Sequence, residues 1–175
     1  MENRMPTHTH HSIPLVLPPA NCFTVLVIDD MLPNRMLLGK FLKNAGYAVF
    51  EATNGIEALD LLRDKVIRPD LVITDVEMPV MDGITLIEQI RYLDSSIATV
   101  PIITASGNAD EQMRREALQA GTDVFLTKPF DLRVLQKEIA GLLKARRRAA
   151  RQLSCDSSLE TQNRVETDTG LRVEK

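Results

Sequence analysis

The chain has 175 residues and a formal net charge of −3, and this length excludes a pair of full-sized domains. Hydrophobic residues make up 44% of it and aromatic residues only 4%, which is enough for one aliphatic core. No apolar run approaches the roughly 18 residues of a membrane span, and Pro14 breaks the short apolar run near the N-terminus, so we predict neither a membrane helix nor a signal peptide. The two cysteines, Cys22 and Cys155, form no disulfide framework and are typical of a reducing compartment, so we expect a cytoplasmic protein.

Charge is unevenly distributed along the chain. Residues 21–143 contain 18 acidic and 12 basic residues, whereas residues 144–151 contain five basic residues and no acidic one. The acidic body is not typical of a nucleic-acid-binding protein, so we expect no direct DNA binding. The basic run at Arg146–Arg148 is read as a solvated helix end, with contact to nucleic acid or membrane as the weaker alternative.

Strand and helix patterns alternate through the middle of the chain, after a proline-rich stretch at residues 1–21 that we predict to be a flexible arm. In chain order, β-branched or apolar runs predict strands, and apolar residues at helical spacing predict helices. The elements expected are strand 23–28, helix 33–45, strand 47–52, helix 54–66, strand 71–74, helix 84–93, strand 100–105, helix 110–120, strand 124–127 and helix 132–150.

Five strand–helix pairs in strict alternation indicate an α/β fold with a doubly wound parallel sheet. The strands at 23–28, 71–74 and 100–105 are nearly continuous apolar runs, as expected for strands covered by helices on both faces. Right-handed crossovers then place all strand carboxyl ends at one edge, where ligands bind in such sheets. The residues at the strand ends are therefore the candidates for function.

Carboxylates and one lysine stand at those ends. Asp29 and Asp30 follow the first strand, Asp75 ends the third, and Lys128 follows the fifth. Two carboxylates about 4 Å apart repel by on the order of 4 kcal/mol at an effective dielectric near 20, more than one lysine offsets. Hard oxygen ligands with room for water and phosphate favour Mg²⁺. A carboxylate beside Mg²⁺ and a lysine is equipped to attack a phosphoryl group and form an acyl phosphate.

The motifs around these residues resemble the receiver domain of two-component response regulators, over residues 22–145. The resemblance rests on the acid pair, residues 69–75 followed by Met78-Pro79 and Asp82-Gly83, residues 100–103 followed by Ser106-Gly107, and residues 120–130, which end in Thr127-Lys128-Pro129-Phe130. It implies a flavodoxin-like fold with strand order 2-1-3-4-5. Residues 146–175 would then be a basic helix extension and a polar tail without an output domain.

The resemblance also implies a role for each site residue. Asp75 would be the phosphoacceptor, and Lys128, with a bond to Pro129 that is often cis in the family, would contact the phosphoryl oxygens. Mg²⁺ would be held by Asp30 and Asp75, helped by Asp29, and by the backbone carbonyl of Glu77. The domain would catalyse only its own phosphorylation and dephosphorylation, and would not otherwise be an enzyme.

The switch residues implied are Ser106 and Phe125. Thr104 is the alternative hydroxyl, and we favour Ser106 because it lies five residues after Pro101 and 22 before Lys128, and because of side-chain alternation along the strand. Phosphorylation would draw Ser106 toward Asp75 and let Phe125 turn inward. The surface of helix 110–120, strand 124–127 and helix 132–150 would then change for an effector protein, or for a second copy of the chain.

Other motifs have plainer interpretations. Asp82-Gly83 is predicted to form a turn and helix cap, and Met78, Pro79 and Met81 to pack in the loop. His8, His10 and His11 could bind a transition metal, but an ordinary tail explains them better.

The resemblance implies a sensor histidine kinase or a histidine phosphotransfer protein as phosphodonor. Three alternatives stay open from sequence. The first is a receiver-fold scaffold that signals without phosphate, and the second is a receiver fragment of a larger regulator. The third is a Mg²⁺-dependent phosphatase with an aspartyl nucleophile, which the lack of a cap domain disfavours.

Overall fold

The computed structural model describes residues 22–93, 95–107 and 110–166. The predicted N-terminal arm, with its three histidines, and the last part of the predicted tail lie outside these residues. Within the described part, no helix has the length and apolar character needed to cross a bilayer.

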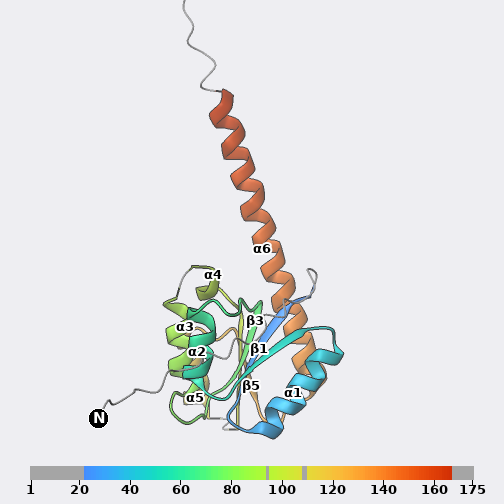
Figure 1. Ribbon diagram of the computed structural model, residues 1–175, viewed down its shortest axis with the longest axis vertical. Coiled ribbons are helices and arrows are strands. Elements are labelled where there is room, and N and C mark those ends of the chain that lie inside the picture. The colour runs from blue at the N-terminus through green and yellow to red at the C-terminus, as the bar shows by residue number, and fades with distance from the viewer. Residues whose placement is uncertain (1–21, 94, 108–109, 167–175) are drawn as a thin grey trace, which may run out of the picture.

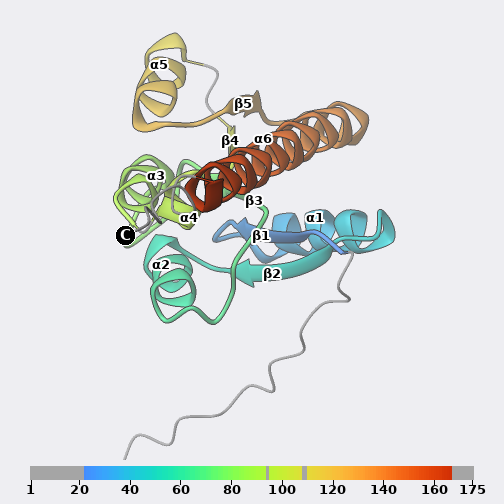
Figure 2. The same cartoon turned by 90° about the horizontal axis from the view of Figure 1, so that it is seen from above.

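A five-stranded parallel sheet forms the centre of the domain, in the order β2-β1-β3-β4-β5, which confirms the predicted topology. Helices cover both faces of this sheet (Figure 1; Figure 2). The strands are β1 (Thr24–Ile28), β2 (Ala48–Ala52), β3 (Leu71–Asp75), β4 (Ile102–Ser106) and β5 (Val124–Thr127). The helices are α1 (Leu32–Asn44), α2 (Gly55–Arg63), α3 (Gly83–Arg91), α4 (Ser95–Ala98), α5 (Glu111–Ala120) and α6 (Leu132–Glu166).

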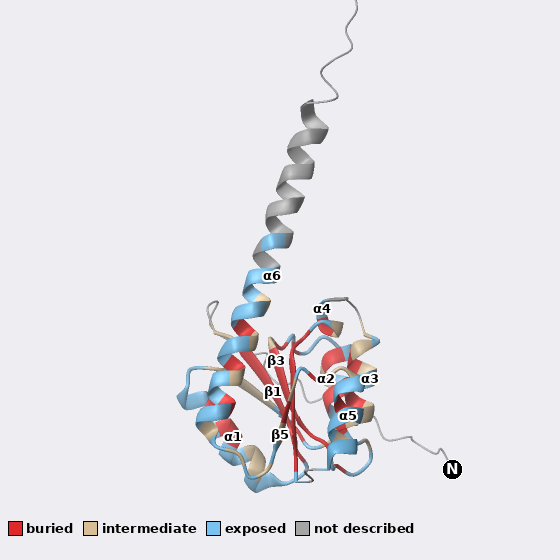
Figure 3. Ribbon diagram, turned by 180° about the vertical axis from the view of Figure 1, so that it is seen from behind, coloured by how far each residue is buried: buried red, intermediate tan, exposed pale blue. Residues whose placement is uncertain are grey.

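Two aliphatic layers hold the helices to the sheet. On one face, Val27 and Ile73 of the central strands pack against Leu38 of α1 and Leu135 of α6. On the other face, α2, α3 and α4 pack against the opposite sides of β1, β3 and β4. Figure 3 shows this division, with buried residues on the sheet-facing sides of the helices and exposed ones outside. Burial of β1, β3 and β4 on both faces explains their continuous apolar sequences.

Several predicted boundaries and one predicted face differ from the structure. The fourth strand begins and ends later than predicted, so Ser106 is its last residue rather than the residue after it. The short helix α4 was not predicted. In α2, Ile56 was expected on the buried side but is 42% exposed, and the small Ala58 is buried instead. Val66, expected in the same helix, lies beyond its end at Arg63 and is 39% exposed.

The last helix is longer than predicted, because α6 continues through the basic run to Glu166. It leaves the domain body as a single helix (Figure 1). Two of its arginines contact the body: the Arg147 guanidinium lies 4.3 Å from the Phe23 ring centroid, and Arg146 donates to the carbonyl of Ser96. Arg148 is exposed. The basic run is thus only partly the solvated helix end that the sequence indicated.

Candidate functional site

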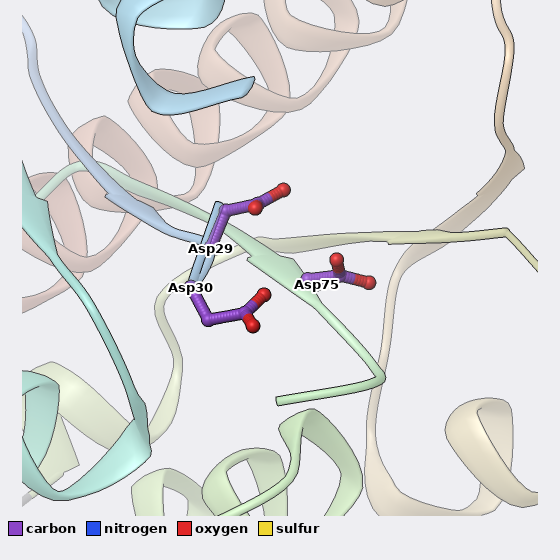
Figure 4. A group of neighbouring side chains, drawn as sticks. All are labelled: Asp29, Asp30 and Asp75. Atoms are coloured by element: carbon purple, nitrogen blue, oxygen red, sulfur yellow. The ribbon is translucent and has the colours of Figure 1, made fainter. Parts of the chain in front are cut away.

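Three carboxylates meet at the carboxyl edge of the sheet. Asp29 and Asp30 follow β1, and Asp75 ends the neighbouring strand β3, so the parallel register brings them together. One oxygen of each lies within 4.8 Å of one oxygen of the others, and Figure 4 shows the three side chains grouped at the ends of the two strands. Asp29 and Asp75 are buried, whereas Asp30 is exposed. The predicted acidic cluster is therefore formed.

Lys128 joins the two buried carboxylates. Its Nζ donates to Asp75 Oδ2 at 2.6 Å and to Asp29 Oδ2 at 2.7 Å. It follows β5, two strands from β3 in the sheet, and its bond to Pro129 is cis, as the resemblance implied. Among the described residues, Lys128 is thus the only positively charged side chain that forms an ion pair with this cluster.

Burial and charge set the proton affinities of this pair. Burial raises the pKa of Asp75, and the hydrogen bond and charge of Lys128 offset only part of the rise. Burial by itself lowers the pKa of Lys128, but the hydrogen bonds to Asp29 and Asp75 outweigh it, so the net change in that pKa is upward. The lysine therefore stays charged, and further positive charge beside Asp75 would stabilise the ionised form of its carboxylate, which burial disfavours.

Two neighbouring side chains on α1 hold the acidic loop, and sequence reasoning missed both. The Asn34 amide donates to both carboxylate oxygens of Asp29, at 3.1 and 3.0 Å. The Arg35 guanidinium donates to the backbone carbonyls of Asp29 and Asp30, at 2.7 and 3.0 Å. With the Met31 amide also bonded to Asp29, that carboxylate is saturated by protein donors. Asp29 is therefore the least available of the three for direct metal coordination.

The remaining oxygens fit a divalent cation. Within the described residues, no hydrogen bond or ion pair engages the exposed Asp30 carboxylate, and Asp75 Oδ1 accepts only a long 3.3 Å bond from the Glu77 amide. Carboxylate oxygens with open positions match the ligands that Mg²⁺ prefers. The residues could therefore hold a metal through Asp30 and Asp75. The role expected for the Glu77 carbonyl stays a prediction.

The loop after Asp75 is held by close backbone packing. Asp82 caps α3 through its bond to the Thr85 amide at 2.8 Å, which confirms its predicted capping role. Gly83 donates its amide to the Val76 carbonyl and lies against the backbone of Asp75. A Cβ at position 83 would lie 2.0 Å from the Asp75 carbonyl oxygen. Only glycine fits here, so Gly83 helps to position the proposed phosphoacceptor.

The two hydroxyls weighed as switch residues have different surroundings. Thr104 is buried within the sheet and shares a hydrogen bond with Thr122. Ser106, also buried, lies at the carboxyl end of β4, and its hydroxyl donates to Met113 Sδ at 3.3 Å. Alternation along the strand could not have separated them, because residues two apart share a face. Their positions along β4 distinguish them. Ala105 is the register partner of Asp75, so Ser106 lies one residue beyond that level, toward the carboxyl edge, and Thr104 lies one residue before it.

Phe125, the other expected switch residue, is already inside the domain. It is 8% exposed and packs in a small cluster with Val76 and Ala117, bordered by Ile84 and Met113. We expected its ring to turn inward only when Ser106 moved. In this structure the ring is inside while Ser106 contacts Met113, so burial of Phe125 does not depend on prior movement of Ser106.

Comparisons with known proteins place these observations in a family context. The family model described as the response regulator receiver domain matches residues 25–140. The chain is 37% identical over 108 residues to sporulation initiation phosphotransferase F of Bacillus subtilis. This match covers 62% of this chain and 83% of that protein. It is 38% identical over 116 residues to the sensor histidine kinase RcsC of Salmonella typhimurium, but spans only 12% of that longer protein.

Solved structures agree with the sequence relatives. The chemotaxis response regulator CheY4 of Vibrio cholerae superposes with a TM-score of 0.62 at 30% identity, covering 69% of this chain and 98% of that one. A response regulator receiver protein from Pseudomonas putida superposes with a TM-score of 0.64 at 33% identity, covering 70% and 99%.

Proposed function

Because the chain belongs to the response regulator receiver domain family, we propose that it accepts a phosphoryl group on Asp75 and signals through the resulting change of shape. The observation that carries the proposal is the pairing of a buried carboxylate with Lys128 beside two further acids at the sheet edge. A domain that only provided a scaffold would not need this costly charge cluster.

The reaction is an in-line displacement. A carboxylate oxygen of Asp75 attacks the phosphorus of a phosphohistidine, the O–P bond forms, and the N–P bond breaks with its electron pair retained by the imidazole nitrogen. Lys128 binds a phosphoryl oxygen through the ammonium group that now contacts Asp75. Bound Mg²⁺ would supply further positive charge against the phosphoryl oxygens. Asp30 and Asp75, helped by Asp29 and the Glu77 carbonyl, would hold it.

The partners follow from this chemistry. The donor would be a sensor histidine kinase or a histidine phosphotransfer protein, and the reaction would take place in the cytoplasm. The domain would turn over only its own phosphate, and would not act as an enzyme on other substrates. The output would be read on α5, β5 and α6 by an effector protein or a second copy, without direct DNA contact.

Phosphoryl uptake from an acyl phosphate donor tests the proposal. With Mg²⁺, intact mass spectrometry should show one added phosphoryl group on the wild-type chain and on Asp60→Asn, whose carboxylate is exposed on α2. Asp75→Asn should remain unmodified, and a chelator should suppress uptake by the wild type. Uptake that survives Asp75→Asn would contradict the assignment. No uptake, with a folded protein that binds Mg²⁺, would favour the phosphate-independent scaffold.

A further inference from the structure

Met113 lies between the two switch residues. Its sulfur accepts a hydrogen bond from the Ser106 hydroxyl at 3.3 Å, and its side chain borders the cluster that contains Phe125. Met113 lies in the first turn of α5, a helix of the surface proposed to change on phosphorylation. A single side chain therefore links the end of β4 to that helix.

The chemistry of the contact makes it easy to exchange. A thioether sulfur is a weak acceptor, whereas a phosphoryl oxygen is charged and accepts stronger hydrogen bonds. Ser106 is buried at the carboxyl end of β4, next in sequence to Ala105, the register partner of Asp75. A phosphoryl group on Asp75 can therefore draw the hydroxyl away from Met113 at modest cost.

We propose that Met113 positions the switch: its sulfur holds the Ser106 hydroxyl in the resting state and so sets how readily Asp75 phosphorylation releases α5. This inference rests on the proposed function, and it adds a residue on α5 to the switch. Since Phe125 is already buried, the Ser106–Met113 contact is a connection between β4 and α5 that movement of Ser106 would break.

Two substitutions should shift the switch in opposite directions. Met113→Leu conserves side-chain volume and removes the acceptor, so the resting state loses a contact. Met113→Gln keeps an unbranched side chain of similar length and offers a stronger amide acceptor. The assay measures the concentration of beryllofluoride, a mimic of the phosphoryl group, that half-saturates each variant in the presence of Mg²⁺. This concentration should fall about threefold for Met113→Leu and rise about threefold for Met113→Gln, as one hydrogen bond lost or gained implies.

Controls separate this role from ordinary packing. Leu118→Gln introduces the same amide at a half-exposed position of α5, and should leave half-saturation unchanged. In a Ser106→Ala background, both Met113 substitutions should lose their effect on half-saturation, because the donor is gone. Urea unfolding of each variant would report packing changes independently of beryllofluoride binding.

The outcomes are distinct for the two proposals. If the wild type binds beryllofluoride and both Met113 variants match it, or shift in the same direction, the Met113 inference is wrong while the proposed function stands. An effect that persists after Ser106→Ala also overturns it. If the wild type binds Mg²⁺ but never beryllofluoride, the proposed function fails, and the inference fails with it.

Discussion

Replacing Gly83 by alanine should damage both the fold and the site. The new Cβ would lie 2.0 Å from the Asp75 carbonyl oxygen, 2.9 Å from the Asp75 carbonyl carbon and 3.0 Å from the Val76 Cα. Ordinary contact between such atoms begins at roughly 3.5 Å, so α3 and the end of β3 must separate by more than about 1 Å. All three atoms belong to the backbone and cannot rotate away.

The expected cost follows from this overlap. Overpacking of a rigid site typically costs 1–3 kcal/mol, and the clash here belongs at the upper end, about 3 kcal/mol of unfolding free energy. A displacement of about 1 Å at a reacting group can also slow a reaction on the order of a hundredfold. Phosphoryl uptake by the folded variant should therefore fall more than its loss of stability alone would explain.

Gly141 provides a matched control. It is exposed in α6, and a Cβ there would meet nothing within 4 Å. Gly141→Ala should therefore raise the free energy of unfolding by about 0.5–1 kcal/mol through helix propensity. Urea unfolding followed by circular dichroism compares the two variants, and the phosphoryl uptake assay compares their sites. If Gly83→Ala loses less than about 1 kcal/mol and takes up phosphate like the wild type, the close packing described here is wrong.

Three further predictions concern charge and backbone strain. Asp75→Asn should raise the melting temperature near pH 7. The raised pKa of Asp75 means that its ionised carboxylate costs stability, and this cost disappears as the pH falls below the ordinary pKa of aspartic acid. The advantage of the variant should therefore vanish in acid, and an advantage independent of pH would contradict the prediction. Arg91→Met should lower the free energy of unfolding, measured in urea, by about 2–4 kcal/mol, because the carbonyls of Val100 and Gly121 lose their donor. A loss within about 0.5 kcal/mol would show that water replaces the Arg91 guanidinium. Val80→Gly should stabilise the domain by up to about 1 kcal/mol in thermal melts. Val80 has φ 72° in a tight turn in which the Met81 amide donates to the Pro79 carbonyl, a backbone conformation that favours glycine. Destabilisation would mean that the turn is not strained.

The sequence was sufficient for the sheet and for the acids at its edge because both depend on short, regular patterns. Buried parallel strands must be aliphatic throughout, and the residue where each strand ends must lie at the shared edge. Those two rules brought Asp29, Asp75 and Lys128 together without knowledge of any contact.

What the sequence did not predict depends on particular contacts. Asn34 and Arg35 are ordinary polar residues of a helix, and only their position over the β1 loop makes them hydrogen-bond the acids and their carbonyls. In α2, counting large apolar residues selected Ile56 and overlooked Ala58, which is small enough to lie close to the sheet. The inward position of Phe125 is set by its neighbours in space, which no local pattern specifies.

The length of α6 has a mechanical consequence. Arg147 is the last of its side chains for which a contact with the domain body is described, and the helix continues to Glu166, about 28 Å farther at 1.5 Å per residue. The part from Leu132 to Arg147, about 22 Å long, is the held end of a lever, and the part beyond it is longer. A tilt of about 10° around Arg147 would move the far end of the helix by about 5 Å. A small change in the angle at which α6 packs on the sheet therefore becomes a displacement of several ångströms at the end of the helix.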